Sequence, residues 1–458
     1  MKDLTQGSIA RHIVTMAVPI AVGMIFQTLY YMIDLYFVGE LGDVPLAGVS
    51  AAGNATFLVL ALTQVLGVGT VAMISQAVGR KDRDEANVVF NQSLTLAAVS
   101  GLAVLVLGYL TTTPYMRSVA ADAATVEAGR TYLFWFMPGL ALQFALVAMG
   151  SALRGTGLVQ PTLVVQLLTI VLNAILAPIL IAGWGTHRPM GVAGAGLAST
   201  LSLVVAVIAL WAYFRRLERY VGVSAPLLRP RLPIWRQLLA IGLPSGGEFA
   251  LIFVYSAIVY WTLREFGSAA QAGYGAGSRL IQGLILPAMA VSFAAGPIAG
   301  QNFGAKLADR VRSTFSISAA IISALMVLLT LFVGWRAEAL IGSFAKNADS
   351  IAVGAQFLRF ACWNFVAQGL IFTCSSIFQG LGNTTPSLLS SGARLVTFAV
   401  PAIWLSTLPG FRIELVWYLS IASTTLQAIA SVLLLRAEFK QRFVPGFVAS
   451  GAGLGANS

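Results

Sequence analysis

Cysteine, histidine and charged residues are all scarce in this chain of 458 residues. The two cysteines, Cys362 and Cys374, lie in one apolar segment and imply no framework of disulfides. The two histidines, His12 and His187, are far apart, and the sequence has neither the spacing of a metal site nor that of a catalytic triad. It also lacks a Walker-type phosphate loop. We therefore expect no metal, no cofactor and no enzymatic activity.

Charged residues make up only 10% of the chain, whereas hydrophobic residues make up 58%. Soluble domains carry about 25% charged residues. Apolar stretches of about 20 residues, the length that spans a bilayer, recur along the chain. Twelve of them begin near residues 13, 46, 88, 125, 162, 191, 238, 271, 313, 350, 387 and 414. The sequence thus predicts an all-α membrane protein with twelve transmembrane helices.

The chain also repeats itself. When it is shifted by 225 residues, identical residues meet over a stretch of about 150 residues. They include Pro19 and Pro244, Tyr30 and Tyr255, Gln76 and Gln301, Gly79 and Gly304, Lys81 and Lys306, Gly155 and Gly380, Gly157 and Gly382, and Pro161 and Pro386. Such a repeat is typical of secondary transporters, whose halves move about a central site.

The repeat predicts two lobes of six helices in the same orientation. The predicted N-terminal lobe comprises residues 1–214, and the predicted C-terminal lobe comprises residues 238–440. A polar cytoplasmic loop, 215–237, joins them. The tail, 441–458, is rich in glycine and alanine, and we expect it to be disordered.

The net charge of +11 is a topology signal, and we expect no nucleic-acid partner. Basic residues gather on one side of the predicted membrane, whereas the other side has scattered ones. The rich side holds Arg80, Lys81, Arg83, Arg215, Arg216, Arg219, Arg229, Arg231, Arg236, Lys306, Arg310, Arg312, Arg436, Lys440 and Arg442. This bias marks the cytoplasmic side. We expect a multi-pass membrane protein with both termini in the cytoplasm.

Two carboxylates lie well inside predicted spans, Asp34 in the first and Glu248 in the seventh. A charge at the centre of a membrane helix costs about 2.5–3.5 kcal/mol on insertion scales. In the repeat, Asp34 is opposite Val259 and Glu248 is opposite Gly23, so each half has one acid at a different depth. Each acid either bonds to a neighbouring helix or takes up and releases a coupling ion.

Gln27, Tyr30 and Asp34 are spaced i, i+3 and i+7, which places them on one face of a helix. Because lipid cannot satisfy polar groups, this face should point to the protein interior or to a water-filled cavity. We predict that Gln27 contacts a bound substrate there.

Arg394 in the eleventh predicted span is the clearest intramembrane base. It is either a structural partner or a contact for a substrate. Tyr31 and Tyr255 lie near the expected cavity, where their rings either stack on a cationic compound or simply pack. We include Arg394, Tyr31 and Tyr255 among the candidate substrate-binding residues.

Several segments together resemble the MATE (multidrug and toxic compound extrusion) transporters. They are 29–39 with Asp34 inside it, 46–49, 153–157, 191–198, 242–244 followed by Glu248, and 379–386. The resemblance covers about residues 4–440. It implies two six-helix lobes that export amphipathic, often cationic drugs or toxic compounds in exchange for protons or sodium ions. The expected partners are therefore a drug-like small molecule, a coupling ion and the lipid bilayer, with the protein as a monomer.

The resemblance also assigns ion-coupling positions. They fall on Asp34, Tyr30, Asn173, Ser199 and Glu248. The family's second aspartate, four residues after Asn173, is Ala177 here. A sodium ion needs several oxygen ligands, so this departure favours a proton.

Two related functions remain open: an exporter dedicated to one metabolite, and a flippase of lipid-linked precursors. A narrow substrate range would indicate the first, and a basic central cavity with extra spans the second. A membrane-embedded enzyme would need a catalytic constellation, and none is visible in the sequence.

Overall fold

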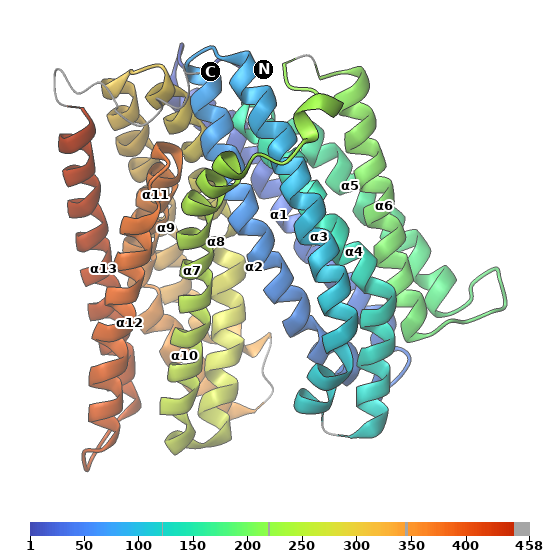
Figure 1. Ribbon diagram of the computed structural model, residues 1–458. Helices are drawn as coiled ribbons and strands as arrows, with labels where there is room; N and C mark the ends of the chain where they lie inside the picture. Colours follow the sequence, from blue (N-terminus) through green and yellow to red (C-terminus); the bar gives the residue numbers. More distant parts are fainter. Residues whose placement is uncertain (121, 219, 344–346, 444–458) are drawn as a thin grey trace. The chain divides into compact units, whose positions relative to one another are not determined.

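The structure is a computed structural model that describes residues 1–443 except 121, 219 and 344–346. The described part of the chain is almost entirely helical and contains no β-strand, which confirms the all-α prediction. The helices shown in Figure 1 are α1 (Ile9–Gly39), α2 (Asp43–Gly79), α3 (Arg83–Val119), α4 (Ala123–Gly155), α5 (Gln160–Ile181), α6 (Val192–Arg216), the 3-10 helix η1 (Ala225–Leu228), α7 (Leu232–Leu263), the 3-10 helix η2 (Arg264–Phe266), α8 (Gly267–Gly304), α9 (Ala308–Gly342), α10 (Ala348–Ala361), α11 (Asn364–Leu381), α12 (Thr385–Ser406) and α13 (Ile413–Arg442).

These helices account for the twelve predicted spans. Within the described residues, ten segments are long and apolar enough to cross a membrane, and the bent pair α10–α11 adds an eleventh. One of the ten, Leu232–Gly304, contains both α7 and α8, so that counting these two helices separately gives twelve. In the predicted tail, α13 extends through Arg442, and residues 444–458 lie outside the described residues.

The tenth span differs from a simple helix because α10 and α11 meet at an angle of 55°. A helix break frees backbone groups that lipid cannot satisfy. Here the hydroxyl of Thr330 on α9 donates to the carbonyl oxygen of Cys362 at 2.8 Å. The same carbonyl oxygen accepts from the backbone N–H of Phe365 at 3.1 Å, so backbone and side-chain donors together satisfy the bend.

The repeat is visible in the backbone. The first and last residues of α5 and α12 are each 225 positions apart. Lys81 and Lys306, which are repeat partners, both have a φ of 60°, a left-handed value that residues with a side chain rarely adopt. Positive φ angles also recur at Gly42 and Gly267 and at Gly157 and Gly382.

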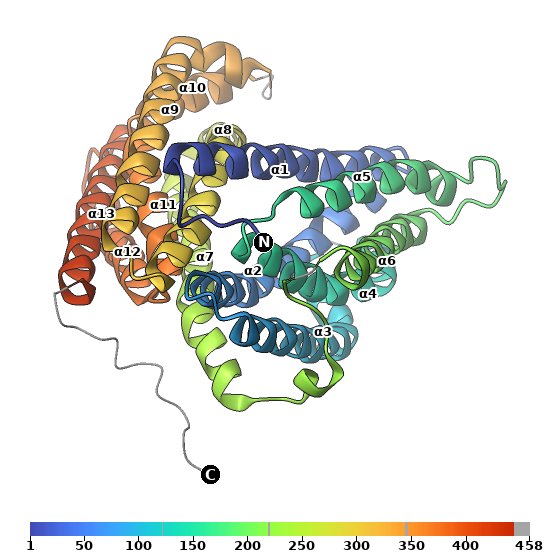
Figure 2. The same ribbon diagram turned by 90° about the horizontal axis from the view of Figure 1, so that it is seen from above.

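The described chain divides into two compact units. Unit 1 comprises Met1–Ala250, Leu286–Ser318 and Gln379–Thr384, and unit 2 comprises Leu251–Ile285, Ala319–Phe378 and the chain from Thr385 onward. Within unit 1, α2 packs on α3 and α4, α1 lies beside α5, and α6 packs on α4 and α5 (Figures 1 and 2). Within unit 2, α13 packs on α10 and α12. The lobe boundaries deduced from the sequence stay a prediction.

Unit 1 contains a reciprocal contact between the two halves of the repeat. The side-chain amide of Gln76 donates to the carbonyl oxygen of Gly380 at 2.9 Å. Its repeat partner Gln301 donates to the carbonyl oxygen of Gly155 at 3.0 Å. Gly155 and Gly380 lie in the last turns of α4 and α11, where helix carbonyls have no intrahelical partner. Each half of the repeat therefore supplies a hydrogen-bond donor to a backbone carbonyl oxygen at a helix end of the other half.

Next to this contact, α2 and α8 approach each other backbone to backbone. A Cβ atom added to Gly79 would overlap the carbonyl oxygen of Gln301, and one added to Gly304 would overlap that of Gln76. Because only glycine leaves room for this approach, the two glycines are a packing requirement of the repeat.

The segment between α6 and α7 is anchored to α3, which it crosses in Figure 1. Three side chains of α3 hold its backbone, and each both donates and accepts hydrogen bonds. Asn87 bonds to Tyr220 and Gly222, Asn91 bonds to Gly222 and Ser224, and Gln92 bonds to Leu227, Arg229 and Arg231. The connection is therefore a docked element of unit 1.

We expect Gly79→Ala to lower the midpoint of thermal denaturation of the purified protein in detergent, because the new methyl group meets a backbone carbonyl. Gly53→Ala on the same helix is the matched control, since a Cβ atom there meets no atom within 4 Å. The control should keep or raise the midpoint, because alanine favours a helix over glycine by about 1 kcal/mol. Equal midpoints for the two variants would contradict the close approach of α2 and α8.

Candidate functional site

A buried carboxylate lies at the centre of unit 1. Asp34 on α1 is only 5% exposed. Its Oδ2 accepts a hydrogen bond from the hydroxyl of Ser199 on α6 at 3.2 Å and a longer one from the hydroxyl of Tyr132 on α4 at 3.5 Å. Asn173 on α5 donates to the Ser199 hydroxyl at 3.3 Å. Four helices thus contribute to this group, which with Tyr30 we name the Asp34 cluster.

Three oxygen atoms of the Asp34 cluster are buried without a hydrogen-bond partner among the described residues. They are Oδ1 of Asp34, Oδ1 of Asn173 and the hydroxyl oxygen of Tyr30. A buried polar atom left unpaired costs about 1–3 kcal/mol, so native proteins rarely retain several at one place. The chemistry of these oxygens suits the uptake of a proton or of a small cation.

Packing between α4 and α6 brings the hydroxyl groups to the carboxylate. The side chain of Thr200, next to Ser199, donates to the carbonyl oxygen of Trp135 at 2.6 Å. This bond ties α6 to the turn of α4 that carries Tyr132. On α5, one turn after Asn173, Ala177 is fully buried and presents only a methyl group. The cluster therefore contains a single carboxylate.

The structure brings Asp34 together with Asn173 and Ser199, as the family resemblance implied. Tyr132 was not among the site residues predicted from the sequence. The repeat contains a signal for it: the position 225 residues later is Phe357, which lacks the hydroxyl, just as Asp34 is opposite Val259. The carboxylate of Asp34 and the hydroxyl of Tyr132 are thus present in only one half of the repeat, and this difference is the signal.

Glu248, the other predicted ion-coupling residue, lies on α7 and is half-buried. Its neighbour Phe249 lines the cavity of unit 1 described below, whereas Glu248 is not among the residues that line it. Its role in ion coupling stays a prediction.

Beside the Asp34 cluster, unit 1 contains a partly open cavity of about 360 Å³. Its polar lining includes Gln27, Gln64, Gln143, Gln166, Tyr30, Tyr31 and Arg154. Gln166 donates to Gln27 at 3.3 Å, and Arg154 donates to Ser151 at 2.9 Å. Two predicted substrate-binding residues, Gln27 and Tyr31, thus face one cavity. Tyr30 belongs to both the cavity wall and the Asp34 cluster.

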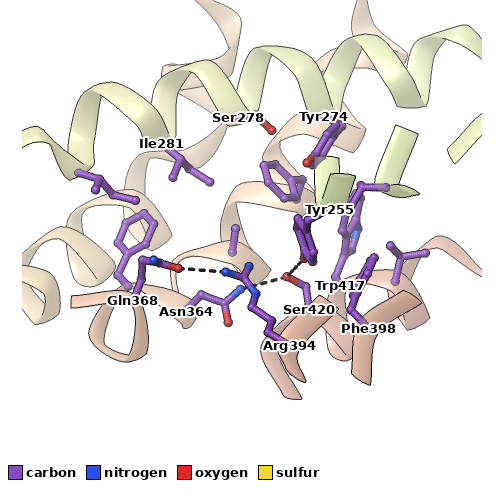
Figure 3. A pocket seen from close by; sticks show the side chains of 16 residues that line it. Tyr255, Tyr274, Ser278, Ile281, Asn364, Gln368, Arg394, Phe398, Trp417 and Ser420 are labelled. Carbon is purple, nitrogen blue, oxygen red and sulfur yellow. Dashed lines mark hydrogen bonds between the residues drawn. The ribbon is translucent and has the colours of Figure 1, made fainter. Parts of the chain in front are cut away.

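Unit 2 contains a second, smaller cavity of about 160 Å³ that is partly open (Figure 3). Arg394 on α12 enters it, with its guanidinium carbon 4.5 Å from the ring centroid of Tyr255. A guanidinium nitrogen, Nη1, donates to the side chain of Gln368 at 3.4 Å. The hydroxyl of Tyr255 donates to Ser420 at 2.9 Å. The two other predicted substrate-binding residues, Tyr255 and Arg394, therefore share this second cavity.

A comparison with protein families identifies the chain. The model of the MatE family matches residues 19–179 and, a second time, residues 244–405, which together make up more than half of the chain. The chain belongs to the MATE family. The two matches begin 225 residues apart, so they coincide with the repeat, and the resemblance deduced from the sequence is confirmed. Members of the MATE family are transporters, which makes this chain a multi-pass membrane protein and, at the level of the family, not an enzyme.

Individual relatives cover nearly the whole chain. The multidrug export protein MepA of Staphylococcus saprophyticus is 26% identical, with 94% of this chain and 95% of the relative covered. An FAD transporter of Shewanella oneidensis is 24% identical, with 88% and 89% covered. Among solved structures, an outward-facing MATE family transporter has a TM-score of 0.89 at 23% identity, with 96% of this chain and 99% of that chain covered.

We expect Tyr132→Phe and Ser199→Ala to destabilise the protein only while Asp34 is present. A hydrogen bond to a charged group contributes about 1.5–3 kcal/mol. With an unfolding entropy of about 2.1 cal/mol/K per residue, each variant should lower the thermal midpoint by roughly 1.5–3 °C. In an Asp34→Ala background, both effects should shrink, since partners in one network are not additive.

Two matched controls separate this effect from the loss of any hydroxyl group. Tyr109→Phe removes an exposed hydroxyl of α3, and Ser118→Ala removes another near the end of the same helix. Equal shifts in the two backgrounds for Tyr132→Phe would show that Tyr132 does not act through Asp34.

Proposed function

We propose that this protein is a secondary antiporter of a bacterial inner membrane that exports amphipathic, often cationic compounds in exchange for protons. The observation that carries the proposal is the buried Asp34 carboxylate, which has two hydroxyl donors on one oxygen and no described partner on the other. The name of the staphylococcal relative, a multidrug export protein, supports the substrate class.

The composition of the Asp34 cluster favours a proton over a sodium ion. Asp34 is its only carboxylate, because Ala177 occupies the position of the family's second acid. The remaining oxygens, on Tyr30, Asn173 and Ser199, are neutral. A hard cation prefers several oxygen ligands and usually carboxylates among them, whereas a proton requires one carboxylate oxygen.

Proton uptake would alter the hydrogen bonds of the cluster. An ionised carboxylate only accepts hydrogen bonds, whereas a protonated one also donates. Protonation of Asp34 therefore changes the hydrogen bonds that its carboxyl group can form with the hydroxyls of Ser199 and Tyr132. Tyr30 transmits this change, because it lies one turn from Asp34 and also lines the cavity of unit 1. Coupling between proton uptake and substrate binding requires that the contacts of the site differ between its protonated and ionised states.

The energy of a proton is sufficient for export. One charge crossing 100 mV supplies about 2.3 kcal/mol. At about 1.4 kcal/mol per factor of ten, this sustains roughly a fortyfold gradient of a neutral compound. For a singly charged cation, one-for-one exchange moves no net charge, so the pH gradient drives export in place of the membrane potential.

We further propose that the N-terminus lies on the cytoplasmic side. Arg310, in one of the basic clusters, donates to the backbone carbonyl oxygens of Leu4 and Gly7. The N-terminal segment therefore lies at the same end of unit 1 as this cluster. Since basic residues gather on the cytoplasmic side, this contact supports the orientation deduced from the sequence.

An exporter dedicated to one metabolite is the second candidate, and the FAD transporter of Shewanella oneidensis is the observation that favours it. It would use the same coupling residue but accept few compounds, so the range of exported dyes distinguishes it from the first candidate.

The test is efflux of a fluorescent cationic dye from proteoliposomes under an imposed proton gradient. Wild type should export the dye, and Asp34→Asn should reduce efflux at least roughly tenfold, because an amide cannot replace the titrating carboxylate. The control Asp309→Asn removes a carboxylate that is 96% exposed and should leave efflux unchanged.

Two outcomes would overturn the proposal. Efflux driven by a sodium gradient but not by a proton gradient would assign the site to sodium. If wild type moves no cationic dye under either gradient, the multidrug proposal fails and the dedicated exporter replaces it.

A further inference from the structure

The cavity of unit 2 lies at the repeat position of the Asp34 cluster. Adding 225 to the numbers of four cluster residues gives four residues that line this cavity. Tyr30, Asp34, Tyr132 and Asn173 correspond to Tyr255, Val259, Phe357 and Phe398. The equivalent positions in the second half of the repeat therefore also surround a cavity. They lack the carboxylate, the amide and one of the two phenol hydroxyls.

The unit 2 cavity has acquired a positive charge instead. Arg394 occupies the repeat position of Thr169. None of the described residues that line the cavity is an aspartate or glutamate. Among the described ion pairs, none involves Arg394. Its guanidinium contacts two neutral groups, the amide of Gln368 and the ring of Tyr255.

One nitrogen atom of the Arg394 guanidinium has an unused hydrogen-bond donor. Its Nε is buried and has no hydrogen-bond partner among the described residues, so a rotation of the side chain would bring this donor to a ligand in the cavity. A guanidinium presents parallel N–H groups that match the two oxygens of a carboxylate. Because Nη1 already bonds to Gln368, the edge that carries Nε is the one that remains for an anion.

The rest of the cavity suits an aromatic ring. Its lining contains six aromatic side chains: Tyr255, Tyr274, Phe357, Phe365, Phe398 and Trp417. In Figure 3, Arg394 and Gln368 lie at one side of Tyr255, and Tyr274 and Trp417 lie at the other. The volume of about 160 Å³ is close to that of an engineered cavity of about 150 Å³ that binds benzene. A single ring with a small charged group matches this volume.

We propose that the cavity of unit 2 binds a small aromatic carboxylate, or the aromatic-acid end of a larger compound, with the carboxylate on Arg394 and the ring among the aromatic side chains. This inference rests on the proposed export function in one respect: it extends the substrate class from cations to compounds that carry an acidic group. Binding itself requires neither an ion gradient nor Asp34.

The experiment is calorimetric titration of the purified full-length protein in detergent with benzoate. Benzoate should bind to wild type, and benzylammonium, which has the same ring and the opposite charge, should bind at least tenfold more weakly. Arg394→Gln should weaken benzoate binding at least tenfold. Arg394→Lys should weaken it less, because lysine keeps the charge but lacks the planar fork.

The matched control is Arg264→Gln. Arg264 is also in unit 2 and also lies over an aromatic ring, 4.4 Å from the centroid of Trp261, but it does not line the cavity. The Arg264→Gln variant should bind benzoate as tightly as wild type does. If Arg394→Gln does not fold, as judged by its melting profile, Arg394→Lys carries the comparison.

Unchanged benzoate binding in the folded Arg394 variants would overturn the proposal, as would tighter binding of benzylammonium than of benzoate. Phenyl phosphate binding more tightly than benzoate would overturn the assignment to a carboxylate. The Asp34→Asn variant separates this proposal from the proposed function, because it should lose dye efflux and still bind benzoate. Loss of benzoate binding in Arg394→Gln with intact dye efflux would leave the export function standing.

Discussion

The need to satisfy backbone carbonyls at helix ends that are buried inside the protein governs the way the two halves of this chain meet. Gln76 and Gln301 each supply a donor to a glycine carbonyl of the opposite half. This exchange brings α2 and α8 so close that Gly79 and Gly304 have no room for a Cβ atom. The same residues are repeat partners, so one duplicated motif produces both the hydrogen bonds and the close backbone contact.

Duplication also explains the relation between the two cavities. Both halves place aromatic residues around an internal space, but the electrostatics of the two spaces differ. A carboxylate lies beside the space in unit 1, whereas a guanidinium enters the space in unit 2. Because burial of an isolated charge is costly, neither would persist without a compensating role. Arg154 also lines the space in unit 1, so the halves differ chiefly in Asp34, whose repeat position is Val259 in the second half. The repeated scaffold thus offers a carboxylate for a proton beside one space and a guanidinium for an acidic ligand in the other.

Much of the fold could be predicted because membrane spans are signalled locally. Apolar runs mark the twelve spans, and a constant offset of 225 relates them. The bend between α10 and α11 escaped prediction, since no proline marks it and its Cys362 carbonyl is met by Thr330, which is distant in the sequence. For the site, the resemblance supplied Asn173 and Ser199. Tyr132 was missed because one tyrosine in an aromatic-rich segment carries no local mark of its hydrogen bond to Asp34.

The sequence by itself determined that the chain is helical, crosses a membrane repeatedly, carries an internal repeat and buries Asp34 and Arg394 in apolar segments. These properties depend on composition and on spacing along one helix. Only the tertiary structure decided which side chains share a cavity. It placed Gln27 and Tyr31 in one space and Tyr255 and Arg394 in another. The reason is physical: the rotation of each helix about its axis is set by packing against its neighbours, and hydropathy does not encode it.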